Sequence, residues 1–414
     1  MNKKAILKFG IIIIIGVVLA SAAMSAGVLA DAPPDSEYSD ILNTTDGDGT
    51  LSNPHVVTTL EELQAMNSSL SAHYVLGNNI NASETELWNS GAGFTPIGNG
   101  SEFSGNFNGQ GFSVDGLSIN RPNTNYAVGL FGKVNSADIK NIGVTTLDIQ
   151  GRDSVGGLVG DSINTNITKS YSNSNVYGNQ YVGGLVGYNR NTNITKSYSN
   201  SNVYGHDEVG GLVGYSRNTN ITKSYSNSSV TGEYDVGGLV GENVGSSYIK
   251  KSYSSGAVTG DFSEVGGLVG SNYGAIITNS YSSGSVSGDR AVGGLVGYNS
   301  DAGTVVDSYW NIETSTQSTS EGGATGLTTA DMTGSSAETK MVGFDFTSEW
   351  RTVSASDADS AADSYPIILD SSEEEEAVIV SESSSEEYGG MSTLVSVALL
   401  FVLFSVMVLL LVKD

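Results

Sequence analysis

The chain has 414 residues and a formal net charge of −26, with 53 Gly, 6 Pro and no Cys. Without Cys, neither disulfides nor thiolate metal sites can hold the fold, and the three His residues do not have metal-ligand spacing. The negative charge argues against nucleic acid and anionic membrane surfaces as partners. We therefore expect no cofactor, no metal site and no nucleic-acid partner.

The N-terminus has the pattern of a secretory signal peptide. Three Lys residues precede an apolar run over residues 11–23, and small residues then lead to Ala30. Basic, apolar and small-residue segments in this order are typical of signal peptides that are removed after export. We expect residues 1–30 to be such a signal, with an uncleaved signal anchor as the alternative because the apolar run is long.

The middle of the chain repeats at intervals of 27 to 29 residues. The motif Val-Gly-Gly-Leu-Val-Gly starts at Val155, Val182, Val209, Val236, Val265 and Val292. A Ser-Tyr pair recurs with its ring at Tyr171, Tyr198, Tyr225, Tyr253, Tyr281 and Tyr309. A Val-x-Gly element recurs at Val176, Val203, Val230, Val258 and Val286. Self-similarity at this period is typical of solenoids, propellers and other arrays.

The length and composition of the unit favour a β-solenoid over the other arrays. A unit of 27 residues is too short for a four-stranded propeller blade and lacks the period of helical repeats. It offers three β-prone pieces, Val-Gly-Gly-Leu-Val-Gly, Ile-Thr-Lys-Ser-Tyr-Ser and Asn-Val-Tyr-Gly, separated by turn-forming residues. We predict an all-β fold, a β-solenoid with coils of about 27 residues stacked about 4.8 Å apart. A right-handed β-helix is favoured because left-handed hexapeptide coils are shorter.

Within each coil, the Ser that precedes the Tyr is expected to point inward and to form a ladder with its equivalents. The alternation of a strand predicts that Leu212 faces the core and that Val209 and Val213 differ in exposure. A Lys also recurs in each unit, at Lys169, Lys196, Lys223 and Lys251. We expect these Lys side chains to form a solvated outer face that prevents sideways aggregation.

Composition divides the rest of the chain into segments. We expect an N-terminal cap with the first irregular coils over residues 31–126, the regular solenoid over 127–330 and its C-terminal end over 331–369. Residues 370–390 contain four consecutive Glu and repeated Ser and are expected to form a solvated acidic stalk.

The C-terminus has the composition of a membrane anchor. Residues 391–412 contain no charged side chain, and 22 helical residues span about 33 Å, close to the hydrocarbon thickness of a bilayer. We predict one C-terminal transmembrane helix there, with residues 413–414 as a cytoplasmic tail and the bulk of the chain outside the cell. A core helix is the alternative. The expected location is therefore the cell membrane, with a single pass.

Motifs before, within and after the repeats resemble those of the GLUG-repeat proteins of bacterial and archaeal surfaces. Examples are Gly93-Phe94-Thr95-Pro96-Ile97-Gly98 before the repeats, and Ser308-Tyr309-Trp310 and Phe344-Asp345-Phe346 after them. The resemblance covers about residues 46–369 and implies a β-solenoid surface protein, often adhesin-like, without naming a ligand. Some family members carry a zinc peptidase domain. The present chain has no His-Glu-x-x-His, so that activity does not carry over.

Two sets of residues are candidates for surface contacts. Asn-x-Ser/Thr sequons mark accessible loops if the host glycosylates, and the alternative is a turn-forming Asn that happens to precede Ser or Thr. The sequons are at Asn43, Asn67, Asn81, Asn99, Asn166, Asn193, Asn220 and Asn227. The Tyr column from Tyr171 to Tyr309 is the candidate ligand contact if it points outward. We favour a packing role for it.

These features predict a non-enzymatic, surface-anchored protein that adheres to or recognises glycan or protein ligands outside the cell. A passive envelope or spacer protein is the first alternative, and a polysaccharide-active β-helix enzyme is the second. Outward aromatic residues would favour binding, and a uniformly polar surface would favour the spacer. A cleft with three or more converging carboxylates would favour cleavage.

Overall fold

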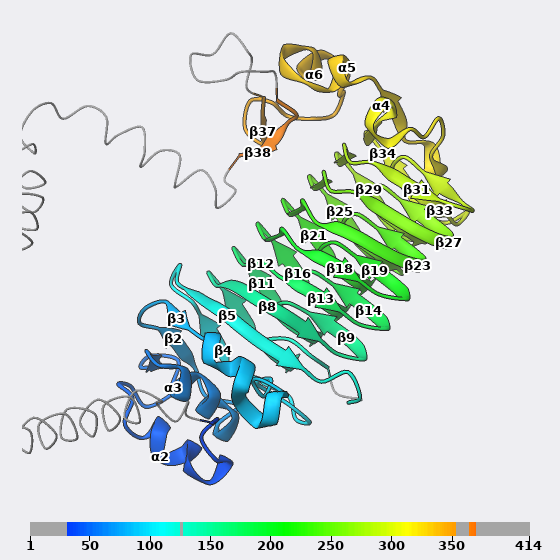
Figure 1. The fold of residues 1–414 in the computed structure, drawn as a ribbon. Coiled ribbons are helices and arrows are strands. Elements are labelled where there is room, and N and C mark those ends of the chain that lie inside the picture. Colours follow the sequence, from blue (N-terminus) through cyan, green and yellow to red (C-terminus); the bar gives the residue numbers. More distant parts are fainter. Residues whose placement is uncertain (1–30, 125–126, 353–363, 370–414) are drawn as a thin grey trace, which may run out of the picture. The chain divides into compact units, whose positions relative to one another are not determined.

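The computed structural model describes residues 31–124, 127–352 and 364–369. The central coils stack on one another with parallel strands, so the predicted β-solenoid is confirmed (Figure 1). The predicted signal peptide (1–30), acidic stalk (370–390) and transmembrane helix (391–412) lie outside the described residues. Among the helices that the structure does describe, none has the length and apolar character needed to cross a membrane.

Three parallel sheets run along the solenoid axis. The first contains ten strands, namely β1 (His55–Val57), β2 (Tyr74–Leu76), β4 (Asn106–Asn108), β7 (Asp138–Lys140), β11 (Asn166–Thr168), β16 (Asn193–Thr195), β21 (Asn220–Thr222), β25 (Tyr248–Lys250), β29 (Ile276–Thr278) and β34 (Thr304–Val306). The second contains seven strands, namely β6 (Phe131–Asn135), β10 (Val159–Ile163), β15 (Val186–Arg190), β20 (Val213–Arg217), β24 (Val240–Val244), β28 (Val269–Tyr273) and β33 (Val296–Asn299). The third contains 19 short strands, because each coil contributes several segments to it.

The coil that contains β15 and β16 illustrates the arrangement. Its contributions to the third sheet are β14 (Gln180–Gly183), β17 (Tyr198–Ser199) and β18 (Asn202–Tyr204). Each strand pairs with the strand one repeat later, as in Val182 with Val209 and Ile194 with Ile221. The register therefore equals the 27-residue period of the sequence.

The Val-Gly-Gly-Leu-Val-Gly motif forms a corner and not a single strand. In the coil described above, Gly183 ends β14 and Val186 begins β15. A Cβ atom on the intervening Gly184 would lie 2.1 Å from the Ser199 Oγ and 2.3 Å from the Gly211 carbonyl oxygen. Glycine is needed there because any side chain would collide with the inward Ser199 hydroxyl and with the backbone of the next coil.

The corner changes the predicted burial pattern. Val209, Leu212 and Val213 are all fully buried, so the expected difference in exposure between the two Val residues is wrong. Strand alternation does not apply because the chain bends between β19 (Asp207–Gly210) and β20. All three side chains therefore contribute to the aliphatic core.

The predicted inward Ser ladder is present. Ser170, Ser197 and Ser224 are buried. The Ser197 Oγ accepts a hydrogen bond from the Ser170 backbone N–H (3.2 Å) and donates one to the Thr195 carbonyl oxygen (3.0 Å). The same bonds recur through Ser252, Ser280 and Ser308. The buried hydroxyls thus satisfy the backbone at the turn between two sheets.

Both ends of the coil stack carry short helices. On the N-terminal side are α2 (Tyr38–Leu42) and α3 (Leu60–Ala65), and a capping box between Thr59 and Glu62 begins α3. On the C-terminal side the chain forms α4 (Ile312–Ser315), β36 (Thr325–Leu327), α5 (Thr329–Met332) and α6 (Gly334–Lys340). It ends in an antiparallel pair, β37 (Trp350–Arg351) and β38 (Ile367–Ile368).

Candidate functional site

The Tyr column forms a continuous stack of rings along the solenoid. Ring centroids of Tyr171 and Tyr198 are 5.0 Å apart, those of Tyr198 and Tyr225 are 4.9 Å apart, and the rings in each pair are almost parallel. The stack continues through Tyr253 and Tyr281. The neighbouring Ser172 and Ser199 point into the core, so the Tyr rings stand on the outside of the coils.

The C-terminal segment of the chain covers four of these Tyr rings. We call the described part of residues 329–369 the cover. Tyr225, Tyr253, Tyr281 and Tyr309 share one buried cluster with six residues of the cover, namely Met332, Ala337, Met341, Phe344, Trp350 and Ile368. The Tyr281 hydroxyl donates to the Pro366 carbonyl oxygen (2.7 Å), and the Tyr309 hydroxyl donates to that of Val342 (2.7 Å). Most of the column is therefore packing surface for the chain's own C-terminal part.

Two members of the Lys column also contact the cover. Lys223 and Lys251 each place Nζ 2.9 Å from the Glu349 carboxylate, and neither side chain is more than 23% exposed. Partial burial acts to raise the pKa of Glu349, but the hydrogen bonds and positive charges of the two Lys residues hold it below its usual range. At these two positions the solvated Lys face expected from the sequence is wrong, because an acidic residue of the cover pairs with both side chains.

We expect Trp350→Ala to release the cover. Trp350 is fully buried, and its ring lies against Phe344, Tyr281 and Tyr253. Loss of a buried Trp side chain costs about 3–5 kcal/mol, most of which should appear as local opening of the cover. Limited proteolysis should then cut the cover much faster while the coils stay resistant. Val342→Ala is the control because Val342 is 67% exposed; equal cleavage rates in the two variants would contradict the role of Trp350.

Three of the sequon Asn residues form an amide ladder on the first sheet. The Asn193 Nδ2 donates to the Asn166 Oδ1 (2.9 Å), and the Asn220 Nδ2 donates to the Asn193 Oδ1 (2.9 Å). The Asn166 Nδ2 donates to the Asp138 Oδ1 (2.8 Å). All three are exposed, but the nitrogen that would carry a glycan is bound in each.

The other sequons lie in varied surroundings. Asn43, Asn81 and Asn227 are exposed, whereas Asn67 and Asn99 are half-buried. The Asn67 side chain accepts a hydrogen bond from the Gly98 backbone N–H. The Asn227 Nδ2 donates to the Asn200 Oδ1 (3.0 Å).

A different set of side chains, separate from the aliphatic core, varies from coil to coil. One row stands just before each corner and comprises Ser154, Tyr181, Glu208, Asp235, Glu264 and Ala291, all with positive φ. A second row follows the corner on the second sheet and comprises Lys133, Asp161, Tyr188, Tyr215, Glu242, Ser271 and Tyr298, which are register partners. We call these two rows together the variable stripe.

The two rows of the variable stripe face each other. The Tyr181 ring meets Tyr188 at 5.2 Å and Tyr215 at 5.3 Å between centroids, both edge to face. Further along, the Ser271 hydroxyl donates to the Asp235 carboxylate. The rows approach closely because glycine separates them. A Cβ on Gly187 would lie only 2.7 Å from the Tyr181 carbonyl oxygen.

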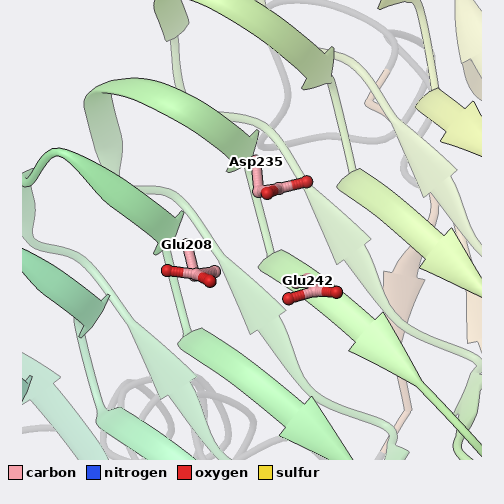
Figure 2. A group of neighbouring side chains, drawn as sticks. All are labelled: Glu208, Asp235 and Glu242. Atoms are coloured by element: carbon pink, nitrogen blue, oxygen red, sulfur yellow. The ribbon is translucent and has the colours of Figure 1, made fainter.

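Three acidic residues converge in the middle of the variable stripe, as Figure 2 shows. One carboxylate oxygen from each of Glu208, Asp235 and Glu242 lies within 4.8 Å of the others. Burial is the main cause that raises their pKa values, to about 7 for Glu208, about 6 for Asp235 and about 7 for Glu242. The charges of neighbouring carboxylates add to this effect. We call these three residues the acid trio.

The acid trio has the residue types for two kinds of chemistry. Carboxylates bind hard cations such as Ca²⁺, which takes about 6–8 oxygen ligands, and within the described ranges this is the only group of three His, Cys, Asp or Glu side chains placed to hold a metal ion. Glycoside hydrolysis uses two carboxyl groups about 5–9.5 Å apart whose pKa values differ. Here all three pKa values are raised, so no acid and base are distinguished.

The acid trio should make stability fall as pH rises. The pKa values of the three carboxyl groups in the folded protein lie above the usual 3.8 of Asp and 4.5 of Glu. At any pH between the usual and the raised values, the folded state therefore binds more protons than the unfolded chain. The contribution of these protons to the free energy of unfolding is fully present below about pH 4 and is lost as pH rises through 7.

Glu242→Gln should therefore raise the melting temperature by about 2–4 °C at pH 8 and leave it nearly unchanged at pH 4.5. This corresponds to about 1 kcal/mol after a discount for solvent screening of a partly exposed group. Thermal melting at both pH values measures it, with the exposed Asp261→Asn as control. An equal gain at pH 4.5 would contradict the raised pKa.

A cavity lies at the N-terminal end of the variable stripe. It has a volume of about 350 Å³, and its lining includes Gly98, Gly100, Lys133, Asp153, Ser154 and Asp161. The Lys133 Nζ is 3.8 Å from the Asp161 carboxylate and 3.9 Å from that of Glu102. Burial raises the pKa of Asp161, while the positive charges of Lys133 and Arg190 act in the opposite direction.

Sequence reasoning did not identify the variable stripe. Glu208 and Asp235 occupy the same phase of successive repeats, and Glu242 follows Asp235 by seven positions. The shared phase is the one available signal, but their closeness to Glu242 depends on the corner. A sequence pattern that does not show the corner indicates only that these three acidic residues lie in separate turns.

Comparison with known proteins bears on the coils that build the variable stripe. Two stretches, residues 178–204 and 263–287, match the family model described as the GLUG motif. The chain thus contains GLUG motifs, as its sequence pattern predicts. The first matched stretch contains Tyr181 and Tyr188 of the variable stripe.

Two relatives are similar in sequence to part of this chain. Halomucin of Haloquadratum walsbyi is 35% identical over 164 residues, which make up 36% of this chain and 2% of halomucin. A protein of Evansella cellulosilytica named as a Gly-rich membrane protein is 32% identical over 123 residues, 28% of this chain and 14% of that protein. The chain spans only these small shares of both relatives.

Two solved structures align with part of this chain. A crystal structure of a Bacteroides ovatus protein titled as an immunoglobulin A1 protease aligns with a TM-score of 0.48 and 18% identity, over 78% of this chain and 94% of that chain. A chain titled IgA1 Protease aligns with a TM-score of 0.39 and 18% identity, over 61% of this chain and 19% of that chain. At this level of similarity neither structure informs the activity of this chain.

Proposed function

We propose that this GLUG-repeat chain is a cell-surface recognition protein without enzymatic activity, whose solenoid presents the variable stripe to glycan or protein ligands. A signal peptide and a single membrane-spanning helix at the C-terminus would hold the solenoid outside the cell. Similarity to a chain named as a membrane protein supports this location. The Tyr column contributes little to ligand contact, because the cover buries four of its rings.

The variation along the stripe carries this proposal. Core positions repeat almost unchanged, as in Val182, Val209 and Val236, all fully buried. In the same coils the residue just before this Val changes from Tyr181 to Glu208 to Asp235. A spacer needs only a soluble exterior, whereas recognition needs different groups at different places. Aromatic and charged side chains that stand together on a rigid scaffold are typical of binding surfaces.

A binding screen tests the proposal. The purified full-length chain should bind a subset of an array of extracellular glycans and matrix proteins. A variant with Tyr181, Tyr188 and Tyr215 all changed to Ser should lose that binding, while Tyr177→Ser combined with Tyr204→Ser, a stacked pair outside the stripe, should retain it. Absence of any specific binding would favour the passive spacer.

The acid trio favours polysaccharide cleavage as a second candidate function. The acid trio brings together three carboxyl groups, the residue type that polysaccharide cleavage uses. Incubation of the full-length chain with polysaccharides should then release reducing ends, and Glu208→Gln should abolish the release. No release from any polysaccharide that the chain binds would leave recognition as the function.

A further inference from the structure

We infer that the N-terminal end of the variable stripe is a seat for a neutral oligosaccharide, in which the cavity beside Lys133 and Asp161 holds a terminal sugar ring and Tyr181 and Tyr188 hold the next one. This inference rests on the proposed function and adds the class of ligand and its position. It is carried by three observations, which concern the cavity, the adjacent rings and the charge beyond them.

The cavity has the size and chemistry for one sugar ring. Its volume of about 350 Å³ lies at the lower end of the range for small-molecule sites. Lys133 lies 3.8 Å from Asp161 and 3.9 Å from Glu102, longer than a direct hydrogen bond of about 2.7–3.2 Å. An ammonium and a carboxylate held apart in this way offer a donor and an acceptor to neighbouring sugar hydroxyls.

Glycines and polar side chains line the cavity. Gly98 and Gly100 in its lining both have positive φ, a conformation that favours glycine. Ser154 and Asp153 line the side toward the first row of the stripe and add a hydroxyl and a carboxylate. The cavity is therefore polar on several sides, as a ring with many hydroxyls requires.

Aromatic rings follow the cavity along the axis. Asp161 pairs in register with Tyr188 of the next coil, so the step from carboxylate to ring is one coil, about 4.8 Å. Tyr181 occupies the position after Ser154 in the first row and packs edge to face on Tyr188. Tyr rings have an apolar face and a polar tip, which suits the apolar face and rim hydroxyls of a second sugar.

The charge beyond these rings selects against acidic glycans. The acid trio starts at Glu208, one coil after Tyr181, and burial already disfavours charge on its members. A carboxylate or sulfate on a bound glycan would add like charge in a partly buried place, at an energetic cost. The ligand that fits the whole arrangement is therefore a neutral oligosaccharide.

Calorimetry with the full-length chain tests this seat. The probes are soluble oligomers of glucose and of N-acetylglucosamine with one to four units, and oligomers of galacturonic acid as acidic counterparts. We expect at least one neutral oligomer to bind with a dissociation constant below about 1 mM and about tenfold more tightly than its monomer. The galacturonic acid oligomers should bind more weakly.

Four variants locate the binding. Asp161→Asn and Tyr188→Ala should each weaken it about tenfold, and Tyr188→Phe should retain most of it. Tyr177→Ala is the matched control, since Tyr177 is 36% exposed and stacks on Tyr204 outside the stripe; it should change affinity by less than about twofold. Thermal melting of each variant separates loss of binding from loss of folding.

Two results would overturn the seat. One is neutral-oligomer binding that Asp161→Asn and Tyr188→Ala leave unchanged. The other is the absence of neutral-oligomer binding by a folded chain that does bind other glycans or proteins in the array screen. In both cases the proposed recognition function would stand and only the seat would fail. Absence of any binding in the array screen would count against the recognition function itself.

Discussion

Leu212→Asp should lower the melting temperature of the protein by about 6–20 °C, whereas Asn218→Asp should leave it almost unchanged. Leu212 is fully buried among the aliphatic side chains of the core. An unpaired charge there costs about 3–5 kcal/mol, which converts to a shift of this size for a domain of a few hundred residues.

Asn218 is the matched position because it lies six residues away and is exposed. Its Oδ1 accepts a hydrogen bond from the Ser246 backbone N–H (3.1 Å), and an Asp carboxylate can accept the same bond. Because the corner also buries Val213, Val213→Asp should be about as harmful as Leu212→Asp. Circular dichroism during heating measures all three variants. If Leu212→Asp melts together with Asn218→Asp, the corner is not part of the core.

Deletion of residues 182–208 should leave a folded protein that is one coil shorter. The deletion removes 27 residues and joins Tyr181 to Val209, the register partner of the Val182 that it replaces. Strand pairing, the Ser ladder and the core columns are then continuous across the joint, because neighbouring coils have equivalent faces.

Deletion of residues 182–195 should abolish cooperative unfolding, because half a coil cannot pair with the coils on either side and leaves core side chains in water. Deletion of residues 186–212 is the control. It also removes 27 residues but starts at another phase of the repeat, and it should be tolerated. Circular dichroism and resistance to protease distinguish the outcomes. Equal damage from all three deletions would rule out the register of the solenoid.

The sequence was sufficient to predict the coils because their determinants recur at a fixed spacing. Val182 and Ile194 each pair with the residue one period later, and the buried Ser197 follows the same rule. Such contacts can be predicted from the repeat period and the residue type alone. The corner was harder to predict, because Val-Gly-Gly-Leu-Val-Gly has the composition of a strand. Only the folded structure brings the Ser199 side chain and the backbone of the next coil so close to Gly184 that no other residue fits there.

The cover and the acid trio could not be predicted because they depend on contacts without a period. Glu349 pairs with Lys223 and Lys251, which are about a hundred residues earlier in the chain, and nothing in their own repeats indicates an acidic partner. Glu208 and Glu242 come together only because the corner folds one row of the variable stripe against the other. Long-range placement of this kind is a property of the folded molecule and not of any local pattern.

The cover has a consequence for how such a gene can change in length. A single segment holds Tyr225, Tyr253, Tyr281 and Tyr309, which belong to four successive coils. Unequal recombination within that set would separate rings that one segment must contact together. Tyr198 packs at the margin of the same cluster, and within the described residues the repeats before it contribute no ring to the cluster. Gain or loss of whole units should therefore be confined to that side. Each unit gained there would move the N-terminal cap about 4.8 Å further from the cover, so the length of the solenoid changes in small, equal steps.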